Sequence, residues 1–180
     1  PQGIGGIILT KEMAQTLTPL IAGGTGSFSH LETMPIHMPD AFEAGTLNLP
    51  GIIGLNEGLS YIESVGMENI HNHELALTKA FLEGLRSITG VNIIGKQGIL
   101  DRTAVVSITI DDMDAASIAY ELESKYHIMT RVGLHCAPRA HQTLGTYPEG
   151  TVRFSFGYAN TLEDVDAALS ALHRIVKNTK

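Results

Sequence analysis

The sequence predicts an α/β fold in which helices cover one face of a mostly antiparallel sheet. Hydrophobic residues make up 43% of the 180 residues and charged residues 17%, which suffices for a packed core. After Gly90 the pattern runs strand, strand, helix, strand, strand, helix. The strand segments are rich in β-branched residues and bounded by Gly or Asp, whereas the helical segments carry apolar stripes at helical spacing.

Little regular structure is expected in the first fifty residues. Residues 5–10 are apolar and predict a short strand, and residues 11–18 predict a brief helix or a loop. Prolines block regular structure from 34 to 50, and a loop of this length in a compact domain is usually functional. The Gly-rich loop 23–29 could cradle a phosphate, but such loops are more often simple turns, and this one lacks the Lys-Ser/Thr ending of a P-loop.

Two consecutive helices follow this loop region. They are predicted over 51–65 and 67–89, with Gly90 as the residue that ends the second helix. Their apolar stripes are Ile52, Leu55, Leu59 and Ile62 in the first helix, and Ile70, Leu77, Phe81, Leu85 and Ile88 in the second.

The second half of the chain alternates strands with two further helices. One of Asp111, Asp112 and Asp114 caps a helix that ends near Lys125, and a sequence resembling a capping box starts the last helix at Thr161. The inward side chains are Ile118, Leu122 and Tyr126 in the former, and Leu162, Val165, Leu169, Leu172 and Val176 in the latter. The strands are predicted over 91–94, 104–110, 129–132 and 151–157.

Charge and composition exclude several classes of partner. The net charge of −7, with scattered basic residues, argues against nucleic acid and anionic membrane surfaces. No apolar stretch approaches the roughly 20 residues that span a bilayer. A single cysteine permits no internal disulfide, which suits a cytoplasmic location. The chain opens at Pro1 in a Gly-rich turn without Met or a signal-peptide pattern, so we expect a fragment of a longer protein.

The segment 130–138 holds the only cysteine, Cys136. A free cysteine is often a small buried hydrophobe. Here it follows His135 in a loop that contains Gly133, and Arg131 lies five residues upstream. Positive neighbours raise the thiolate fraction of a cysteine, so a reactive sulfur is the alternative interpretation.

Arg153 is the charged residue of the predicted strand 151–157. The strand alternates apolar Val152, Phe154 and Phe156 with Arg153 and small polar residues. An arginine at such a position reaches either solvent or a carboxylate, which it binds through two parallel hydrogen bonds. The thiol and the two arginines together suggest a reactive sulfur beside an anion-binding site.

Histidines raise the question of a metal site. His71 and His73 lie two residues apart, so on a helix they project about 200° from each other and cannot bind one ion; we expect both to be solvent-exposed. A loop site built from His135, Cys136 and His141 is kept as an alternative.

Five segments, in this order, resemble the C-terminal part of the cysteine desulfurases, pyridoxal-phosphate enzymes of the class V aminotransferase family. The resemblance extends from residue 1 to about 175 and is nearer to the SufS-like branch than to the branch with a long, mobile cysteine loop. The segments are 23–27, 42–51, 131–137, 144–146 and 152–161.

The resemblance implies roles for five residues. Cys136 matches the nucleophile, Arg153 the arginine that binds the substrate carboxylate, and Arg131 a second arginine near the active site. In these homodimers Thr46, with Gly45 beside it, would reach the cofactor phosphate of the partner subunit. Two departures concern neighbouring positions: Leu47 stands where many members have proline, and Leu134 stands where the nearest group often has histidine.

The family's Schiff-base lysine has no counterpart here. It precedes a Gly-Pro-x-Gly turn whose end resembles residues 1–3, so the resemblance implies that it lies before Pro1. Lys11, Lys79, Lys96 and Lys125 stand in the wrong sequence contexts to replace it. We therefore expect these 180 residues alone to bind no cofactor covalently and to have no turnover.

The implied organisation is the tail of a large domain over 1–50, an interdomain helix over 51–67 and a small α/β domain over 68–180. The implied activity transfers sulfur from L-cysteine to an enzyme persulfide with release of alanine, and leaves room for a sulfur-acceptor protein. The alternatives are a selenocysteine lyase, another class V aminotransferase or lyase, and a non-catalytic domain.

Overall fold

The computed structural model describes residues 2–28 and 30–178, which form two compact units divided between Val65 and Gly66. The first contains α1 (Lys11–Thr16), a single 3-10 turn (Asp40–Phe42) and α2 (Leu49–Val65). Thr10 caps α1 by accepting a hydrogen bond of 3.2 Å from the Met13 amide.

The prediction of a strand over residues 5–10 is wrong. Residues 4–10 have no regular structure, and Ile7 and Ile8 are 84% and 100% exposed. A strand exists only where a neighbouring strand accepts its backbone hydrogen bonds, and no described segment pairs with these residues.

α2 begins two residues before its predicted start because Asn48 caps it. The Asn48 side chain accepts a hydrogen bond of 3.1 Å from the Gly51 amide and donates one of 2.9 Å to the Gly3 carbonyl. Three of the four apolar residues of the stripe predicted for this helix, Ile52, Leu55 and Leu59, are exposed, and Ile62 is half-buried. Gly51 is the one buried residue of the described helix.

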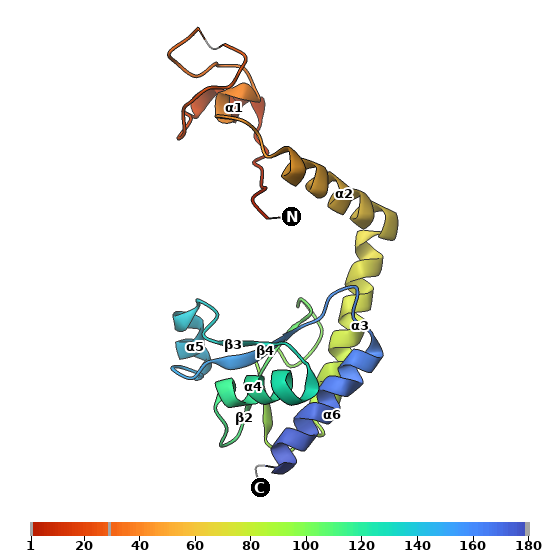
Figure 1. Ribbon diagram of the computed structural model, residues 1–180. Coiled ribbons are helices and arrows are strands. Elements are labelled where there is room, and N and C mark those ends of the chain that lie inside the picture. The colour runs from red at the N-terminus through yellow and green to blue at the C-terminus, as the bar shows by residue number, and fades with distance from the viewer. Residues whose placement is uncertain (1, 29, 179–180) are drawn as a thin grey trace. The chain divides into compact units, whose positions relative to one another are not determined.

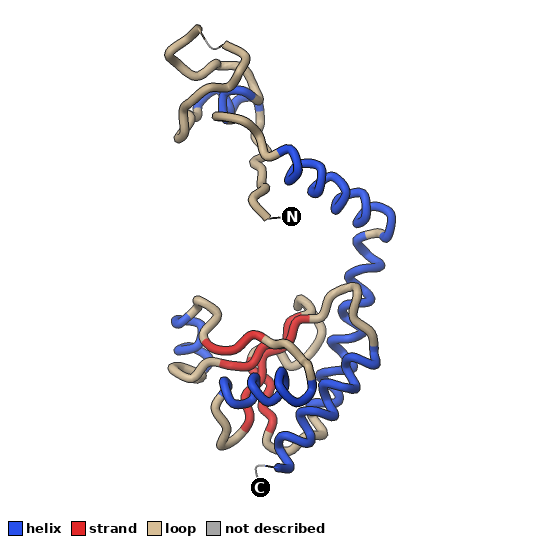
Figure 2. Tube along the Cα trace, viewed as in Figure 1, coloured by secondary structure: helices blue, strands red, loops and turns tan. Residues whose placement is uncertain are grey.

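The second unit is built on a four-stranded sheet in which every pair is antiparallel, in the order β1-β2-β4-β3. The strands are β1 (Val91–Ile94), β2 (Val105–Ile110), β3 (Arg131–Gly133) and β4 (Thr151–Ser155). Three helices pack on one face, α3 (Met67–Leu85), α4 (Ala115–Tyr126) and α6 (Leu162–Asn178), as Figures 1 and 2 show. The predicted α/β fold class is confirmed.

The core lies between this face and the helices. Alternate residues of the central strands, Val106 and Ile108 in β2 and Val152 in β4, have no accessible surface. The ring of Phe81 on α3 packs at 4.9 Å from Phe154 on β4. The intervening residues of the strands form a polar face, on which the candidate site lies.

Helix boundaries follow their capping residues. Asp114 is the cap of α4, because its carboxylate accepts a hydrogen bond of 2.8 Å from the Ser117 amide. The predicted capping box of α6 is confirmed: Asp164 accepts from the Thr161 amide at 3.0 Å, and the Asp164 amide donates to the Thr161 hydroxyl at 3.3 Å. None of the described helices has the length and hydrophobicity to cross a membrane.

Several details differ from the prediction. β3 begins at Arg131 rather than at residue 129, and β4 ends at Ser155 rather than at residue 157. α3 ends at Leu85, and the chain then turns at Gly90, where φ is +94°, into β1. Leu162, expected on the inner side of α6, is 55% exposed. The chain also forms α5 (Pro138–Leu144), which was not predicted because seven residues contain too little apolar periodicity.

Gly150, which precedes β4, allows two segments to pack closely. Its φ is +79°, and a β-carbon there would lie 2.7 Å from the Gly133 α-carbon, too close for any contact. We expect Gly150→Ala to lower the free energy of unfolding by about 2 kcal/mol, measured by urea denaturation. Gly98→Ala, where the added β-carbon meets open space, is the control. Equal midpoints for the two variants would contradict this account.

Candidate functional site

Cys136 is presented to solvent by a tight turn. The Ala137 amide donates a hydrogen bond of 2.8 Å to the Leu134 carbonyl, which closes a four-residue turn. The two central residues, His135 and Cys136, have φ values of +51° and +61°. Cys136 is a free, exposed thiol, so the interpretation as a small buried hydrophobe is wrong.

The two arginines lie directly opposite each other. In the antiparallel pairing of β3 with β4, Arg131 is the partner of Arg153, and Ser107 on β2 is the partner of Arg153 on its other side. Directly paired residues project from the same face of a sheet with their β-carbons about 5 Å apart. Both guanidinium groups therefore extend from the polar face, away from the helices.

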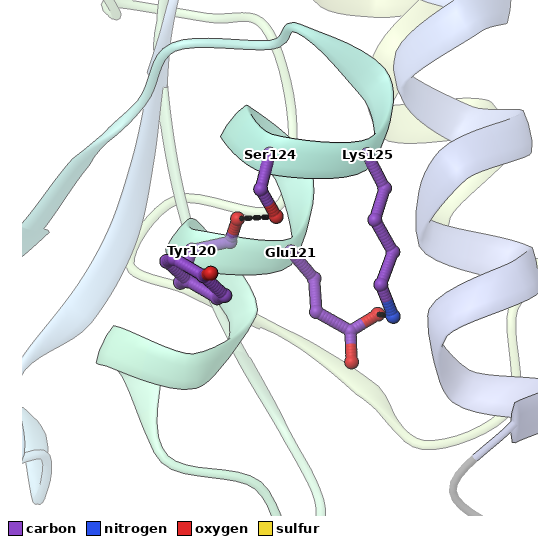
Figure 3. A network of polar contacts seen from close by, with 4 residues as sticks. All are labelled: Tyr120, Glu121, Ser124 and Lys125. Carbon is purple, nitrogen blue, oxygen red and sulfur yellow. Dashed lines mark hydrogen bonds and ion pairs between the residues drawn. The ribbon is translucent and has the colours of Figure 1, made fainter.

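Neither arginine is neutralised by a carboxylate within residues 2–28 and 30–178. The ion pairs found there join Lys79 to Glu83 on α3 and Lys125 to Glu121 on α4. Figure 3 shows the pair on α4, whose atoms lie 2.9 Å apart. It also shows the hydrogen bond that the Ser124 hydroxyl donates to the Tyr120 carbonyl on the same helix. The Arg153 Nε atom is buried and has no hydrogen-bond partner among the described residues. Two adjacent cations with an unsatisfied donor favour a bound anion.

His135, within the turn, forms a polar cluster with three side chains that follow it in the sequence, those of His141, Thr146 and Thr151. His135 Nε2 is 3.3 Å from the Thr151 hydroxyl, and His141 Nδ1 is 2.7 Å from the Thr146 hydroxyl. The two imidazole rings lie 5.7 Å apart. His141, Thr146 and Thr151 are buried.

Sequence reasoning considered His141 only as a metal ligand and assigned no role to Thr146 or Thr151. Pro138 and Gly145 are typical of the first position and the end of a helix, and they could have revealed α5. Such a helix would have placed His141 in its last turn, close to Thr146.

The surroundings of His135 disfavour its protonated form. Burial lowers the pKa of this imidazole, and the positive charges of Arg153 and Arg131, together with His141, lower it further. His135 is therefore neutral at pH 7, and its buried Nδ1 atom has no partner in the described part of the chain.

The metal alternative finds no support. The described residues contain no group of three His, Cys, Asp or Glu side chains arranged to bind a metal ion.

His71 is exposed as expected, whereas the expectation for His73 is wrong. His73 is half-buried, its Nε2 lies 2.8 Å from the Asn160 carbonyl, and its ring meets Tyr158 edge-on.

Gly45 and Thr46 belong to the first unit, and both are exposed. The Gly45 amide donates a hydrogen bond of 2.7 Å to the Gly24 carbonyl, so the segments 23–27 and 42–51 are in contact. Gly45 has a φ of +82°. The Thr25 and Ser27 hydroxyl groups lie 2.9 Å apart in the same loop, and such hydroxyl and amide donors suit a phosphate group.

Three lysines of the described chain are engaged elsewhere. Lys79 and Lys125 pair with glutamates on their own helices, and Lys96 donates to the carbonyls of Leu100 and Asp101.

Comparison with known proteins identifies relatives over the whole chain. Residues 1–168 match the family described as Aminotransferase class-V. A probable cysteine desulfurase of Pyrococcus abyssi is 34% identical over 100% of this chain and 44% of its own length. Probable cysteine desulfurase 2 of Mycobacterium leprae is 32% identical over 97% of this chain and 41% of its own. The chain thus spans about two fifths of the length of these relatives.

Solved structures share the fold. The apo cysteine desulfurase of Thermococcus onnurineus is 37% identical, with a TM-score of 0.73 over 78% of this chain and 34% of its own. The cysteine desulfurase CsdA of Escherichia coli, in an S-sulfonic acid form, is 26% identical, with a TM-score of 0.78 over 93% of this chain and 41% of its own.

The lowered pKa of His135 has a consequence for stability. Below the ordinary histidine pKa of about 6.5, an unfolded chain binds a proton that the folded site resists, so the free energy of unfolding falls as the pH decreases. We expect His135→Gln to lose less stability than the wild type between about pH 7.5 and about pH 5.5 in urea denaturation. His71→Gln, at an exposed position of α3, should behave as the wild type. Identical pH profiles for all three proteins would contradict the expectation.

Proposed function

We propose that this chain, which belongs to the aminotransferase class-V family, is the C-terminal half of a pyridoxal-phosphate-dependent cysteine desulfurase. The observation that carries the proposal is the juxtaposition of an exposed thiol, Cys136, with the unneutralised pair formed by Arg131 and Arg153. The similarity to cysteine desulfurases along the chain supports the same reading.

Arg153 binds the carboxylate of L-cysteine in this proposal. Its position in the middle of β4, between two hydrogen-bonded strands, restricts its side chain. A guanidinium group binds a carboxylate through two parallel hydrogen bonds, which orient the amino acid as well as hold it. Arg131 adds a second positive charge beside the first and increases the attraction for an anionic substrate.

Cys136 acts as the nucleophile. The thiolate attacks the sulfur atom of the substrate cysteine, and an S–S bond forms while the substrate C–S bond breaks. The electron pair of that bond remains with the substrate carbon, which takes up a proton and leaves as alanine. The products are a Cys136 persulfide and alanine, and an acceptor protein would take the sulfur from the exposed turn, which serves sulfur mobilisation.

The cofactor requires residues from both the present chain and the rest of the enzyme. Pyridoxal phosphate supplies an electron sink when it is bound. We propose that Thr46 and Gly45 contact the phosphate of the partner subunit's cofactor in a homodimer, in keeping with their exposed donors. The Schiff-base lysine would lie outside these 180 residues, which alone would have no turnover. Residues 1–50, 51–67 and 68–180 would be the large-domain tail, the interdomain helix and the small domain.

The first test compares the complete enzyme with Cys136→Ala and Cys136→Ser. Both variants remove the sulfur from an exposed position, so we expect alanine and sulfide release from L-cysteine to fall below detection while the cofactor absorbance is unchanged. Full turnover by Cys136→Ala would exclude desulfuration through this thiol. No activity in the wild type would instead indicate another amino-acid transformation on the same fold.

The second test asks whether the two arginines act through their hydrogen-bonding geometry or only through their positive charge. Arg153→Lys replaces two parallel hydrogen bonds by a point charge, and we expect KM for L-cysteine to rise about tenfold or more. Arg131→Lys, at the more exposed position, should raise KM less. Arg174→Lys on α6, remote from the sheet's polar face, is the control. An unchanged KM in Arg153→Lys would remove this residue from the substrate site.

A further inference from the structure

We propose that the buried pair formed by His141 and Thr146 holds the turn that presents Cys136, so that both are positioning residues for the sulfur nucleophile. The inference rests on the proposed function of Cys136. His141 and Thr146 lie outside the turn, and we expect them to make the turn rigid.

The turn needs an external support because its conformation is unfavourable. His135 and Cys136 both have positive φ, a region that residues with a β-carbon rarely occupy. Histidine adopts it more often than most residues do, but cysteine is not among the residues that favour it. Two such residues in succession persist only where neighbouring structure holds them. The hydrogen bond from Ala137 to Leu134 closes the turn but is local to it.

One flank of the turn is held by the sheet. Gly133, the last residue of β3, pairs with Thr151 of β4, and Gly150 packs directly against the Gly133 backbone. This pairing fixes where the chain enters the turn. It leaves the exit, at Ala137 and the first turn of α5, without support from the strands.

The exit is held by His141 and Thr146. The Thr146 hydroxyl lies 2.7 Å from His141 Nδ1, and the Thr146 amide donates a hydrogen bond of 2.9 Å to the His141 carbonyl. The Thr146 carbonyl in turn accepts a hydrogen bond of 2.7 Å from the Gly150 amide. Thr146 therefore connects α5 to Gly150, the residue that packs against the other flank of the turn.

His135 completes this connection from within the turn. Its ring lies 5.7 Å from the ring of His141, and its Nε2 atom lies 3.3 Å from the Thr151 hydroxyl. Without the Thr146 hydroxyl, the buried Nδ1 of His141 loses its partner, and a buried polar atom without a partner is unfavourable. The ring and α5 then relax toward water, and the turn loses the contact that holds His135.

The hydroxyl can be removed with little change of shape. In the complete enzyme, we compare Thr146→Val, which is nearly isosteric, with Thr146→Ser, which keeps the hydroxyl. Thr143→Val is the matched control, because the hydroxyl of this exposed threonine on α5 donates to the Arg139 carbonyl of its own helix. Amide hydrogen exchange of Ala137, whose N–H closes the turn, reports on the turn without depending on activity.

We expect Thr146→Val to speed exchange at Ala137 about tenfold or more, to lower kcat for alanine release about tenfold, and to leave KM within about twofold. The cofactor absorbance should not change, and Thr146→Ser and Thr143→Val should behave as the wild type. An unchanged rate of exchange at Ala137 in Thr146→Val would overturn the proposal. An equal increase in exchange and an equal loss of kcat in Thr146→Ser would also overturn it. Faster exchange with unchanged kcat, in an enzyme that Cys136→Ala inactivates, would also overturn it. If Cys136→Ala remains active, the proposed function fails separately, and the exchange rates still decide whether the pair holds the turn.

Discussion

The antiparallel pairing of β3 with β4 is the constraint on which the candidate site depends. Its register places Arg131 opposite Arg153 and Gly133 opposite Thr151. A shift of one residue would turn Arg153 toward the helices and Val152 toward solvent, because side chains alternate between the two faces of a strand. The buried face prevents that shift, since Val152 has no accessible surface and packs in the core. Core packing thus determines the positions of Arg131 and Arg153.

The same pairing creates an electrostatic problem that a bound anion would resolve. Two guanidinium groups extend from one face, and no described carboxylate neutralises them. The pKa of the neighbouring His135 is lowered, first because burial disfavours its charged form and then because a third positive charge beside Arg153 and Arg131 would be unfavourable. A neutral imidazole can pack against His141 and bond to Thr151 without adding to the repulsion. Charge and packing at the cysteine turn are therefore linked.

The candidate site combines an exposed thiol, Cys136, with the buried pair formed by His141 and Thr146. Cys136 projects from a turn after the short strand β3, where its thiol is exposed to solvent. The segments on either side of the turn are held below the surface, by Gly150 against Gly133 and by Thr146 against His141. The turn makes the thiol accessible, and the polar contacts beneath the turn hold the segments on either side of it.

The sequence by itself determined the α/β class, the four strands and the main helices, since hydrophobic periodicity and capping residues are local signals. It also identified Cys136, Arg131 and Arg153 as the residues to examine. Tertiary structure alone decided that the arginines are cross-strand partners, that His141 meets Thr146, and that residues 5–10 form no strand. These features depend on which segments lie side by side. That choice is made by long-range packing and hydrogen bonding, which no local pattern of residues encodes.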